Sequence, residues 1–259
     1  MVFKLAAVIL TLGNFSFDSL DNRDMGDKVT FFPGRRKLEG TFGTVETPVS
    51  LTIGTLNYSV YLPESPDSLI EDYLGANPSV FDVGEEKIPY WAELWPSAIA
   101  LGEFLLNHPE IITGKRVLEI GAGLGIPSLV AGSLNPASVD ITDYLPEPLD
   151  YARLSWDLNH PDQKANIYKY DWRESLPGTF DVLLASDVAY ERAAFPALLK
   201  CIDSMRGTGA VLVVSEPSRH LAGEFREALM KRPGFQGSEI YEVFRNGLRT
   251  KVFVCSILL

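Results

Sequence analysis

The segment that most constrains the fold of this chain is residues 116–127, where a short apolar run leads into closely spaced glycines and then a proline. The apolar run has the β-branched and aliphatic composition of a strand that is covered on both faces, and consists of Val117, Leu118 and Ile120. The glycines leave the backbone free to turn sharply and to approach a ligand closely, and are Gly121, Gly123 and Gly125. The segment therefore predicts a buried strand, a tight turn and a helix, with a site for a nucleotide-type ligand at the turn.

The spacing of these glycines narrows the choice of ligand. A dinucleotide-binding turn requires the pattern G-x-G-x-x-G, but Ile126 occupies the place of the third glycine. The pattern present is E-x-G-x-G-x-G, and it begins at Glu119. A glycine-rich turn alone also fits a structural corner or another nucleotide-binding fold, so the neighbouring segments must decide between these interpretations.

Three later strands are predicted to end in residues that could contact such a ligand. Asp143 follows the predicted strand at 137–141, Trp172 follows the one at 165–170, and the strand at 180–185 leads into Ser186 and Asp187. In an open parallel sheet the ligand lies outside the carboxyl ends of the strands, so we expect these side chains and the glycine turn to converge. Asp143 could accept hydrogen bonds from both ribose hydroxyls, and Trp172 could offer a flat apolar face to adenine.

Each of these residues also has a structural interpretation that the sequence leaves open. Asp143 could cap the helix that is predicted after Pro146, and Trp172 could belong to the core. Asp187 could cap the turn that follows it, with Tyr190 packed in the core.

The rest of the chain predicts an N-terminal extension and a regular α/β domain. Residues 1–43 are interpreted as a tail or mis-annotated start plus a flexible lead-in, and residues 44–87 as a flap with a β-hairpin at 49–62 and a short helix at 68–74 capped by Asp67 or Ser68. Residues 88–259 are expected to form a doubly wound seven-stranded sheet. Its further helices are predicted at 96–106, 149–159, 192–205 and 220–231, and its last strands at 210–215, 239–244 and 251–257.

The composition limits the class of protein. A formal charge of −11 argues against broad nucleic-acid binding and suits either a basic partner or plain solubility. The two cysteines, Cys201 and Cys255, suggest no disulfide framework, and the three histidines show no metal-ligand spacing, so no metal is expected. No stretch approaches the ~20 apolar residues of a membrane span, and the apolar run at 5–12 lacks the cleavage site of a secretory signal.

Three motifs carry a family resemblance: Trp-Pro-Ser-Ala at 95–98, Glu-Ile-Gly-Ala-Gly-Leu-Gly at 119–125, and Asp-Val-Ala-Tyr at 187–190. Together they resemble the class I, seven-strand protein lysine methyltransferases, which include modifiers of electron-transfer flavoprotein β, calmodulin and chaperones. The last motif is similar to the family's D-x-x-Y signature. The resemblance is close over residues 88–190 and implies a Rossmann-like methyltransferase sheet that binds S-adenosyl-L-methionine.

The resemblance also implies a role for each motif residue. Asp143 would hold the ribose, Trp172 and Ser186 would border the adenine or methionine part, and Asp187 and Tyr190 would line the acceptor channel as the catalytic pair. The remaining cofactor contacts would come from Trp95, Glu119, Gly121, Ala122, Gly123 and Gly125. Trp91 is expected to pack rather than to contact the cofactor. The expected partner is a protein substrate with a target lysine, and the protein itself is expected to be a monomer. It is expected in the cytoplasm, because its cofactor is found there.

Two further hypotheses remain beside a protein N-methyltransferase: a small-molecule methyltransferase acting on an amine or heterocycle, and a cofactor-binding module without turnover. A closed lid formed by the flap would favour a small-molecule substrate, whereas a protein substrate requires an open acidic groove that reaches Asp187. An oxidoreductase ranks below all three.

Overall fold

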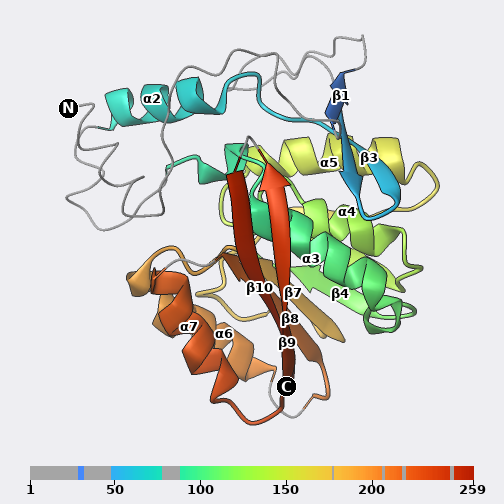
Figure 1. The fold of residues 1–259 in the computed structure, drawn as a ribbon, viewed down its shortest axis with the longest axis vertical. Coiled ribbons are helices and arrows are strands. Elements are labelled where there is room, and N and C mark those ends of the chain that lie inside the picture. Colours follow the sequence, from blue (N-terminus) through green and yellow to red (C-terminus); the bar gives the residue numbers. More distant parts are fainter. Residues whose placement is uncertain are drawn as a thin grey trace.

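The computed structural model describes residues 29–31, 48–77, 88–176, 178–205, 208–217, 220–245 and 248–259. Their main feature is a seven-stranded sheet with the strand order β6-β5-β4-β7-β8-β10-β9 (Figure 1). Five strands are parallel to one another: β4 (Arg116–Glu119), β5 (Ser138–Asp143), β6 (Asn166–Lys169), β7 (Val182–Ser186) and β8 (Val211–Pro217). The antiparallel pair β9 (Phe235–Arg245) and β10 (Leu248–Leu258) completes the sheet. The predicted α/β fold with a seven-stranded doubly wound sheet is thus confirmed.

Helices cover both faces of this sheet. The α-helices are α3 (Pro96–Asn107), α4 (Ile126–Gly132), α5 (Glu147–Asn159), α6 (Phe195–Ser204) and α7 (His220–Met230). Short 3₁₀ helices are η1 (Tyr90–Ala92), η2 (Pro109–Ile111) and η3 (Arg192–Ala194). Successive strand residues point to opposite faces, so Val117 packs with residues of α3, α4 and α5 while Leu118 packs with residues of α6 and α7. This two-sided burial explains why the strands are apolar runs without alternation.

A small separate sheet precedes this domain and contains β1 (Val29–Phe31), β2 (Val49–Ile53) and β3 (Leu56–Val60). The predicted hairpin at 49–62 is therefore present as β2 and β3. Within the segment interpreted as a flexible lead-in, Val29–Phe31 pairs antiparallel with β2 as a strand that the sequence did not predict. Residues 1–28 and 32–47, which hold the predicted tail, lie outside the described residues.

The hairpin is anchored to α5 by polar contacts as well as by its apolar face. The Asn159 side chain accepts a hydrogen bond from the Ser59 amide at 2.9 Å and donates one to the Ser59 carbonyl at 2.8 Å. The Tyr61 amide donates to Ser155 Oγ at 2.9 Å. Apolar hairpin residues join the core that contains α3 and α5. The hairpin therefore packs against α5 and is part of the same hydrophobic core as α3.

The helix predicted at 68–74 is longer than expected and has another cap. It forms α2 (Pro66–Ala76), and Ser65 is its N-cap, whose hydroxyl accepts a hydrogen bond from the Ser68 amide at 3.2 Å. Prolines favour the first helical turn, so Pro66 following a serine was the signal for this earlier start. No residue of α2 is buried.

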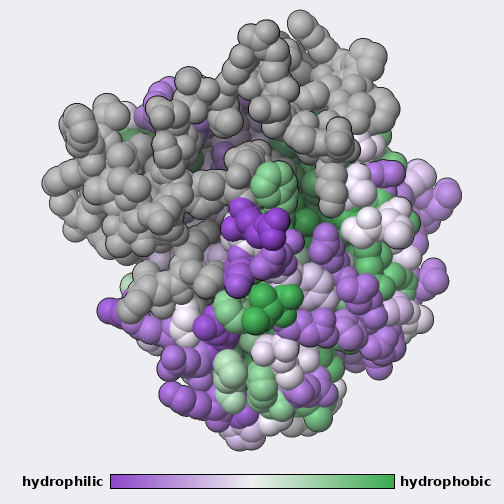
Figure 2. Space-filling model, in the orientation of Figure 1, coloured by the Kyte–Doolittle hydropathy of each residue, from purple (hydrophilic) through white to green (hydrophobic). Residues whose placement is uncertain are grey.

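The edge of the sheet opposite β6 is formed by β9, which exposes large apolar side chains at Ile240 and Phe244. Figure 2 shows hydrophobic residues interspersed with hydrophilic ones on the face that carries β9 and β10.

None of the helices in the described ranges is both long enough and apolar enough to cross a membrane.

Candidate active site

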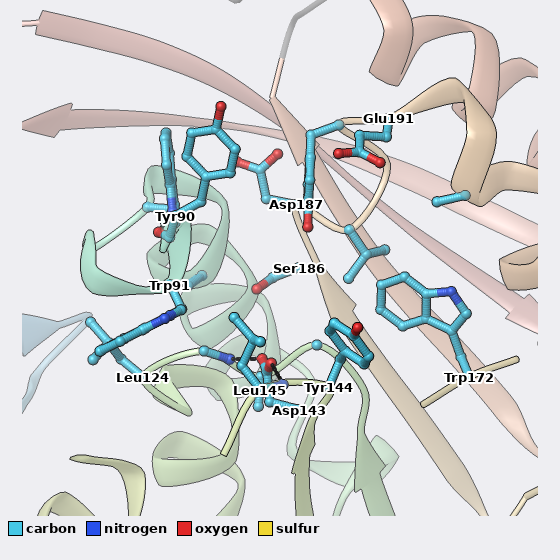
Figure 3. Close-up of a pocket in the computed structure, with 18 of the residues that line it drawn as sticks. Tyr90, Trp91, Leu124, Asp143, Tyr144, Leu145, Trp172, Ser186, Asp187 and Glu191 are labelled. Atoms are coloured by element: carbon cyan, nitrogen blue, oxygen red, sulfur yellow. Dashed lines mark hydrogen bonds between the residues drawn. The ribbon is translucent and has the colours of Figure 1, made fainter. Parts of the chain in front are cut away.

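A cavity of about 550 Å³ lies at the carboxyl ends of β4, β5 and β7. Figure 3 shows Asp143 and Leu145 at one end of it and Asp187 and Glu191 at the other. Nine residues that the sequence proposed for the site line this cavity: Trp95, Gly121, Ala122, Gly123, Asp143, Trp172, Ser186, Asp187 and Tyr190. Glu119 and Gly125 are not in the lining. The strand ends therefore converge as parallel-sheet topology requires.

The glycine turn after β4 depends on backbone conformations that glycine alone adopts easily. Gly121, Gly123 and Gly125 have φ angles of 59°, 53° and 71°, all in the left-handed region. A Cβ atom on Gly121 would stand 3.1 Å from both Trp172 and Val188, which is too close without displacement of a neighbour. The turn thus brings its backbone to the cavity wall while leaving room for the indole of Trp172.

Glu119 lies beneath the turn and is completely buried. Its Oε2 accepts hydrogen bonds from the Ser128 amide at 3.0 Å and from the Ser128 hydroxyl, which ties the end of β4 to the first turn of α4. Its Oε1 has no hydrogen-bond partner among the described residues. Burial raises the pKa of Glu119 to about 8, against the opposing effect of the two Ser128 hydrogen bonds. Glu119 therefore shapes the turn from below and does not face the cavity.

Asp143 ends β5 and fixes the turn from the side. Its Oδ2 accepts from the Gly123 amide at 2.9 Å, and its Oδ1 accepts from the Leu145 amide at 2.9 Å. Burial raises the pKa of Asp143 to about 6, although hydrogen bonds from the backbone oppose this shift. The N-cap of α5 is Pro146, so Asp143 is not the helix cap. The Tyr144 amide also bonds to this carboxylate. Because an ionised carboxyl has about four acceptor positions, at least one remains for a ligand hydroxyl.

Aromatic side chains form much of the wall. Trp91 is buried and packs against Tyr151 with ring centroids 5.5 Å apart, as its predicted packing role requires, yet it also lines the cavity. Trp95 donates from its indole nitrogen to the Tyr90 carbonyl at 2.8 Å, which fixes the indole at the beginning of α3. Trp172 packs against the core beneath α6 and also reaches the cavity. Packing and cavity lining are therefore compatible at these positions.

Asp187 occupies a strained backbone position at the end of β7. Its φ angle is 53°, and Asn135 is the only other non-glycine residue with positive φ in the described ranges. Such a conformation costs about 1–3 kcal/mol, and the residues that hold it cluster at active sites and ligand clamps. Tyr190 lies nearby, with its ring in edge-to-face contact with Tyr90 at a centroid distance of 5.7 Å. The carboxyl and the two phenols thus share one end of the cavity.

The cavity carries an excess of carboxyl groups. One cation of the described residues lines it, Arg173, and this guanidinium forms an ion pair with Asp171 at 2.7 Å. That hydrogen-bonded pair holds the pKa of Asp171 below its usual range. The other acidic lining residues are Glu93, Asp143, Asp187 and Glu191. Such a surface favours a cationic ligand over an anionic one.

Several lining residues were absent from the sequence-based set. They are neighbours of the motif residues and include Tyr90, Glu93, Leu124, Tyr144, Leu145, Arg173 and Glu191. Tyr144 and Leu145 directly follow Asp143, and Glu191 directly follows Tyr190. Adjacency to a motif was the only available signal, because which neighbour points inward depends on the turn after each strand.

A family model described as lysine methyltransferase matches residues 84–232, more than half of the chain. The chain belongs to this lysine methyltransferase family. The matched segment contains every cavity-lining residue named above. The family resemblance inferred from the three sequence motifs is thus confirmed.

The individual relatives of this chain share about a third of their residues with it or fewer. The chain is 27% identical over 187 residues to protein N-terminal and lysine N-methyltransferase EFM7 of Cryptococcus neoformans, covering 64% of this chain and 59% of that protein. It is 34% identical over 131 residues to protein N-lysine methyltransferase METTL21A of Danio rerio, covering 48% of this chain and 59% of the relative. The chain thus spans about three fifths of the length of these curated relatives.

Among solved structures, the fold resembles a tRNA (uracil-54, C5)-methyltransferase of Pyrococcus abyssi, which was crystallised with S-adenosyl-L-homocysteine. The TM-score is 0.53 with 13% sequence identity, and the match covers 95% of this chain and 54% of that one. This similarity concerns the fold alone.

Proposed function

We propose that this protein is an S-adenosyl-L-methionine-dependent methyltransferase that methylates a lysine side chain of a protein substrate. One observation carries the proposal: a single cavity, lined also by the glycine turn and Tyr190, has Asp143 at one end and Asp187 at the other (Figure 3). Donor and acceptor groups held at these two ends would meet inside the cavity. The membership of the chain in the lysine methyltransferase family supports the choice of acceptor.

The residues at the first end suit the proposed cofactor chemically. Asp143 is oriented by backbone amides and can still accept a hydrogen bond from a ribose hydroxyl. Trp172 and Leu145 offer apolar surface to a purine ring, and the glycine turn lets backbone approach the ligand closely. The cofactor also carries an ammonium and a sulfonium charge, which the carboxyl-rich lining would stabilise. When bound, S-adenosyl-L-methionine supplies a methyl carbon made electrophilic by the attached sulfonium.

The residues at the second end suit an amine acceptor. A lysine ammonium has an unperturbed pKa of about 10.4, so it must lose a proton before its nitrogen lone pair can react. Asp187 would accept a hydrogen bond from this amine, orient its lone pair and pass the proton to water. Tyr190 would add a hydroxyl and an aromatic face toward the alkylammonium group. Most of the rate would come from holding the amine in line, an effect that can reach roughly 7–11 kcal/mol.

The position of the N-terminal hairpin favours a protein substrate over a small molecule. No residue of β2, β3 or α2 lines the cavity, so these described elements do not form a lid over it. A lid would be expected to enclose a small substrate, whereas a lysine on a protein must enter from outside. The acidic lining around Asp187 is complementary to a cationic side chain.

We also propose that the protein works as a monomer in the cytoplasm, where its methyl donor is present, and that it acts on neither nucleic acid nor a membrane. Light scattering would test the oligomeric state. Fluorescence microscopy of the tagged full-length chain would test its location.

The proposed activity can be tested with the purified chain, tritiated S-adenosyl-L-methionine and an extract of cells that lack this protein. Label should appear in protein and be released as methylated lysine on hydrolysis. An Asp187→Asn variant should lose this labelling, while Asp157→Asn, which removes an exposed carboxylate on α5, should keep it. Label confined to small molecules would establish the alternative substrate class. Binding of S-adenosyl-L-homocysteine without any labelling would indicate a cofactor-binding module.

A further inference from the structure

A closed ring of three hydrogen bonds connects Asp187 to two completely buried serines. The Asp187 amide donates to the Ser215 carbonyl at 2.9 Å, the Ser215 hydroxyl donates to the Ser97 carbonyl at 2.9 Å, and the Ser97 hydroxyl lies 3.5 Å from Asp187 Oδ2. Each residue thus donates once and accepts once. Ser97 and Ser215 are both 0% exposed.

The ring joins three elements that are far apart in the sequence. Asp187 directly follows β7, Ser215 lies in β8, and Ser97 is the second residue of α3. Ser186 and Ser215 are partners in the parallel ladder, so the bond from the Asp187 amide extends this ladder by one residue beyond the end of β7. The two serines therefore hold the beginning of α3 against the sheet at the place where Asp187 turns.

The ring explains how Asp187 keeps its unusual backbone. A left-handed conformation at a non-glycine residue persists only where its surroundings fix it. Here the amide is held by β8, and the side chain is directed toward α3, where the serine hydroxyl can donate to it. Ser97 Oγ has no other hydrogen-bond partner among the described residues, so its hydroxyl is available for this carboxylate.

We infer that Ser97 is a positioning residue for the methyl-transfer reaction, because its hydroxyl holds the Asp187 carboxylate in the orientation that receives the acceptor amine. This inference rests on the proposed function. The bond at 3.5 Å is long, and catalytic hydrogen bonds commonly shorten when substrate is bound. The Ser97 hydroxyl would then hold the carboxylate in one orientation while the acceptor amine approaches Asp187.

The test compares Ser97→Ala with Ser97→Thr, which keeps the hydroxyl, and with Ser155→Ala as the matched control. Ser155 is also 0% exposed, but its hydroxyl accepts a hydrogen bond from the N-terminal hairpin. Initial rates are measured with tritiated S-adenosyl-L-methionine at saturation, as a function of the concentration of extract protein from cells that lack this protein. This separates the maximal rate from the half-saturating concentration.

We expect Ser97→Ala to lower the maximal rate about tenfold, as the loss of a hydrogen bond to a charged group does, with little change in the half-saturating concentration. Ser97→Thr should restore most of the rate. The acidic limb of the pH–rate profile should move to higher pH in Ser97→Ala, because the charged carboxylate loses a donor. Ser155→Ala should leave both the maximal rate and this limb unchanged.

An unchanged maximal rate in Ser97→Ala, or an equal loss in Ser155→Ala, would overturn the inference. If Ser97→Ala does not fold, Ser215→Ala opens the ring at another bond and should lower the maximal rate by about threefold. An unchanged rate in that variant would also overturn the inference. Calorimetric titration with S-adenosyl-L-homocysteine separates the two proposals. Failure of the wild-type chain to bind refutes the proposed function, whereas normal binding with no effect at Ser97 and Ser215 refutes only the positioning role.

Discussion

The two ends of the cavity are built in different ways. At the glycine turn, the buried Asp143 carboxylate accepts a hydrogen bond from the Gly123 amide, and the buried Glu119 carboxyl accepts one from the Ser128 amide at the start of α4. At the other end, Asp187 depends on side chains and carbonyls from α3 and β8, and its backbone is strained. The first end is thus a local backbone structure, whereas the second is assembled by tertiary packing. Cofactor affinity and turnover should therefore respond to different substitutions.

Asp187→Asn should produce the largest effect. It removes the proposed proton acceptor while preserving size, so labelling of protein should fall by about 10²–10⁴-fold. Affinity for S-adenosyl-L-homocysteine, measured by calorimetry, should change little because this residue lies at the proposed acceptor end, away from Asp143. A comparable loss of cofactor affinity would show that the two ends do not act separately.

Gly121→Ala should instead lower the affinity for S-adenosyl-L-homocysteine. The new Cβ would stand 3.1 Å from Trp172 and Val188, at a φ of 59° that alanine adopts only with strain. The strain of about 1–3 kcal/mol should weaken S-adenosyl-L-homocysteine binding by roughly 10–100-fold. Gly114→Ala is the matched control, since this glycine also has positive φ but a Cβ there would meet no atom within 4 Å. If both variants bind equally well, the close approach at the turn is unimportant.

The buried carboxyls should make stability depend on pH. Burial raises the pKa of Glu119 to about 8 and that of Asp143 to about 6. At each pH between a group's unfolded pKa and its raised folded pKa, the folded state binds more protons than the unfolded state. The free energy of unfolding should therefore fall as pH rises from 5 to 8, by up to ~1.4 kcal/mol per unit for each group. Urea unfolding at pH 5, 6.5 and 8 measures this slope. Glu119→Gln should flatten it, and a slope unchanged in that variant would contradict the assignment to Glu119.

Asn159→Ala should have the smallest effect on cofactor affinity and on the labelling rate. It removes two hydrogen bonds to Ser59 and should lower the free energy of unfolding by about 1–3 kcal/mol. Because the hairpin does not line the cavity, cofactor affinity and the labelling rate of folded protein should remain near wild-type values. Thermal unfolding together with calorimetry checks this. A fall in the cofactor affinity or in the labelling rate of the folded protein would mean that the hairpin affects the site.

Most of the domain architecture could be predicted because its signals are local. The run at Val117 and Leu118, the glycines and the proline-initiated α3 each specify one element, and the boundaries at β4 and α3 agree closely with prediction. The strand Val29–Phe31 was missed because three residues carry too little periodicity, and it exists only by pairing with β2. The cap at Ser65 was missed because several polar residues in that segment could serve equally well.

The sequence by itself determined the family, the sheet and the residues at each strand end, because these are encoded by contiguous motifs whose spacing sets a backbone path. The roles assigned to Trp95, Trp172 and Asp187 within the site stay predictions. Only the tertiary structure decided which neighbours face the cavity, that Trp91 both packs and lines it, and that Ser97 and Ser215 close a ring with Asp187. These relations depend on how α3 is placed against β7 and β8, and that placement results from burial summed over the whole core, which no short motif contains.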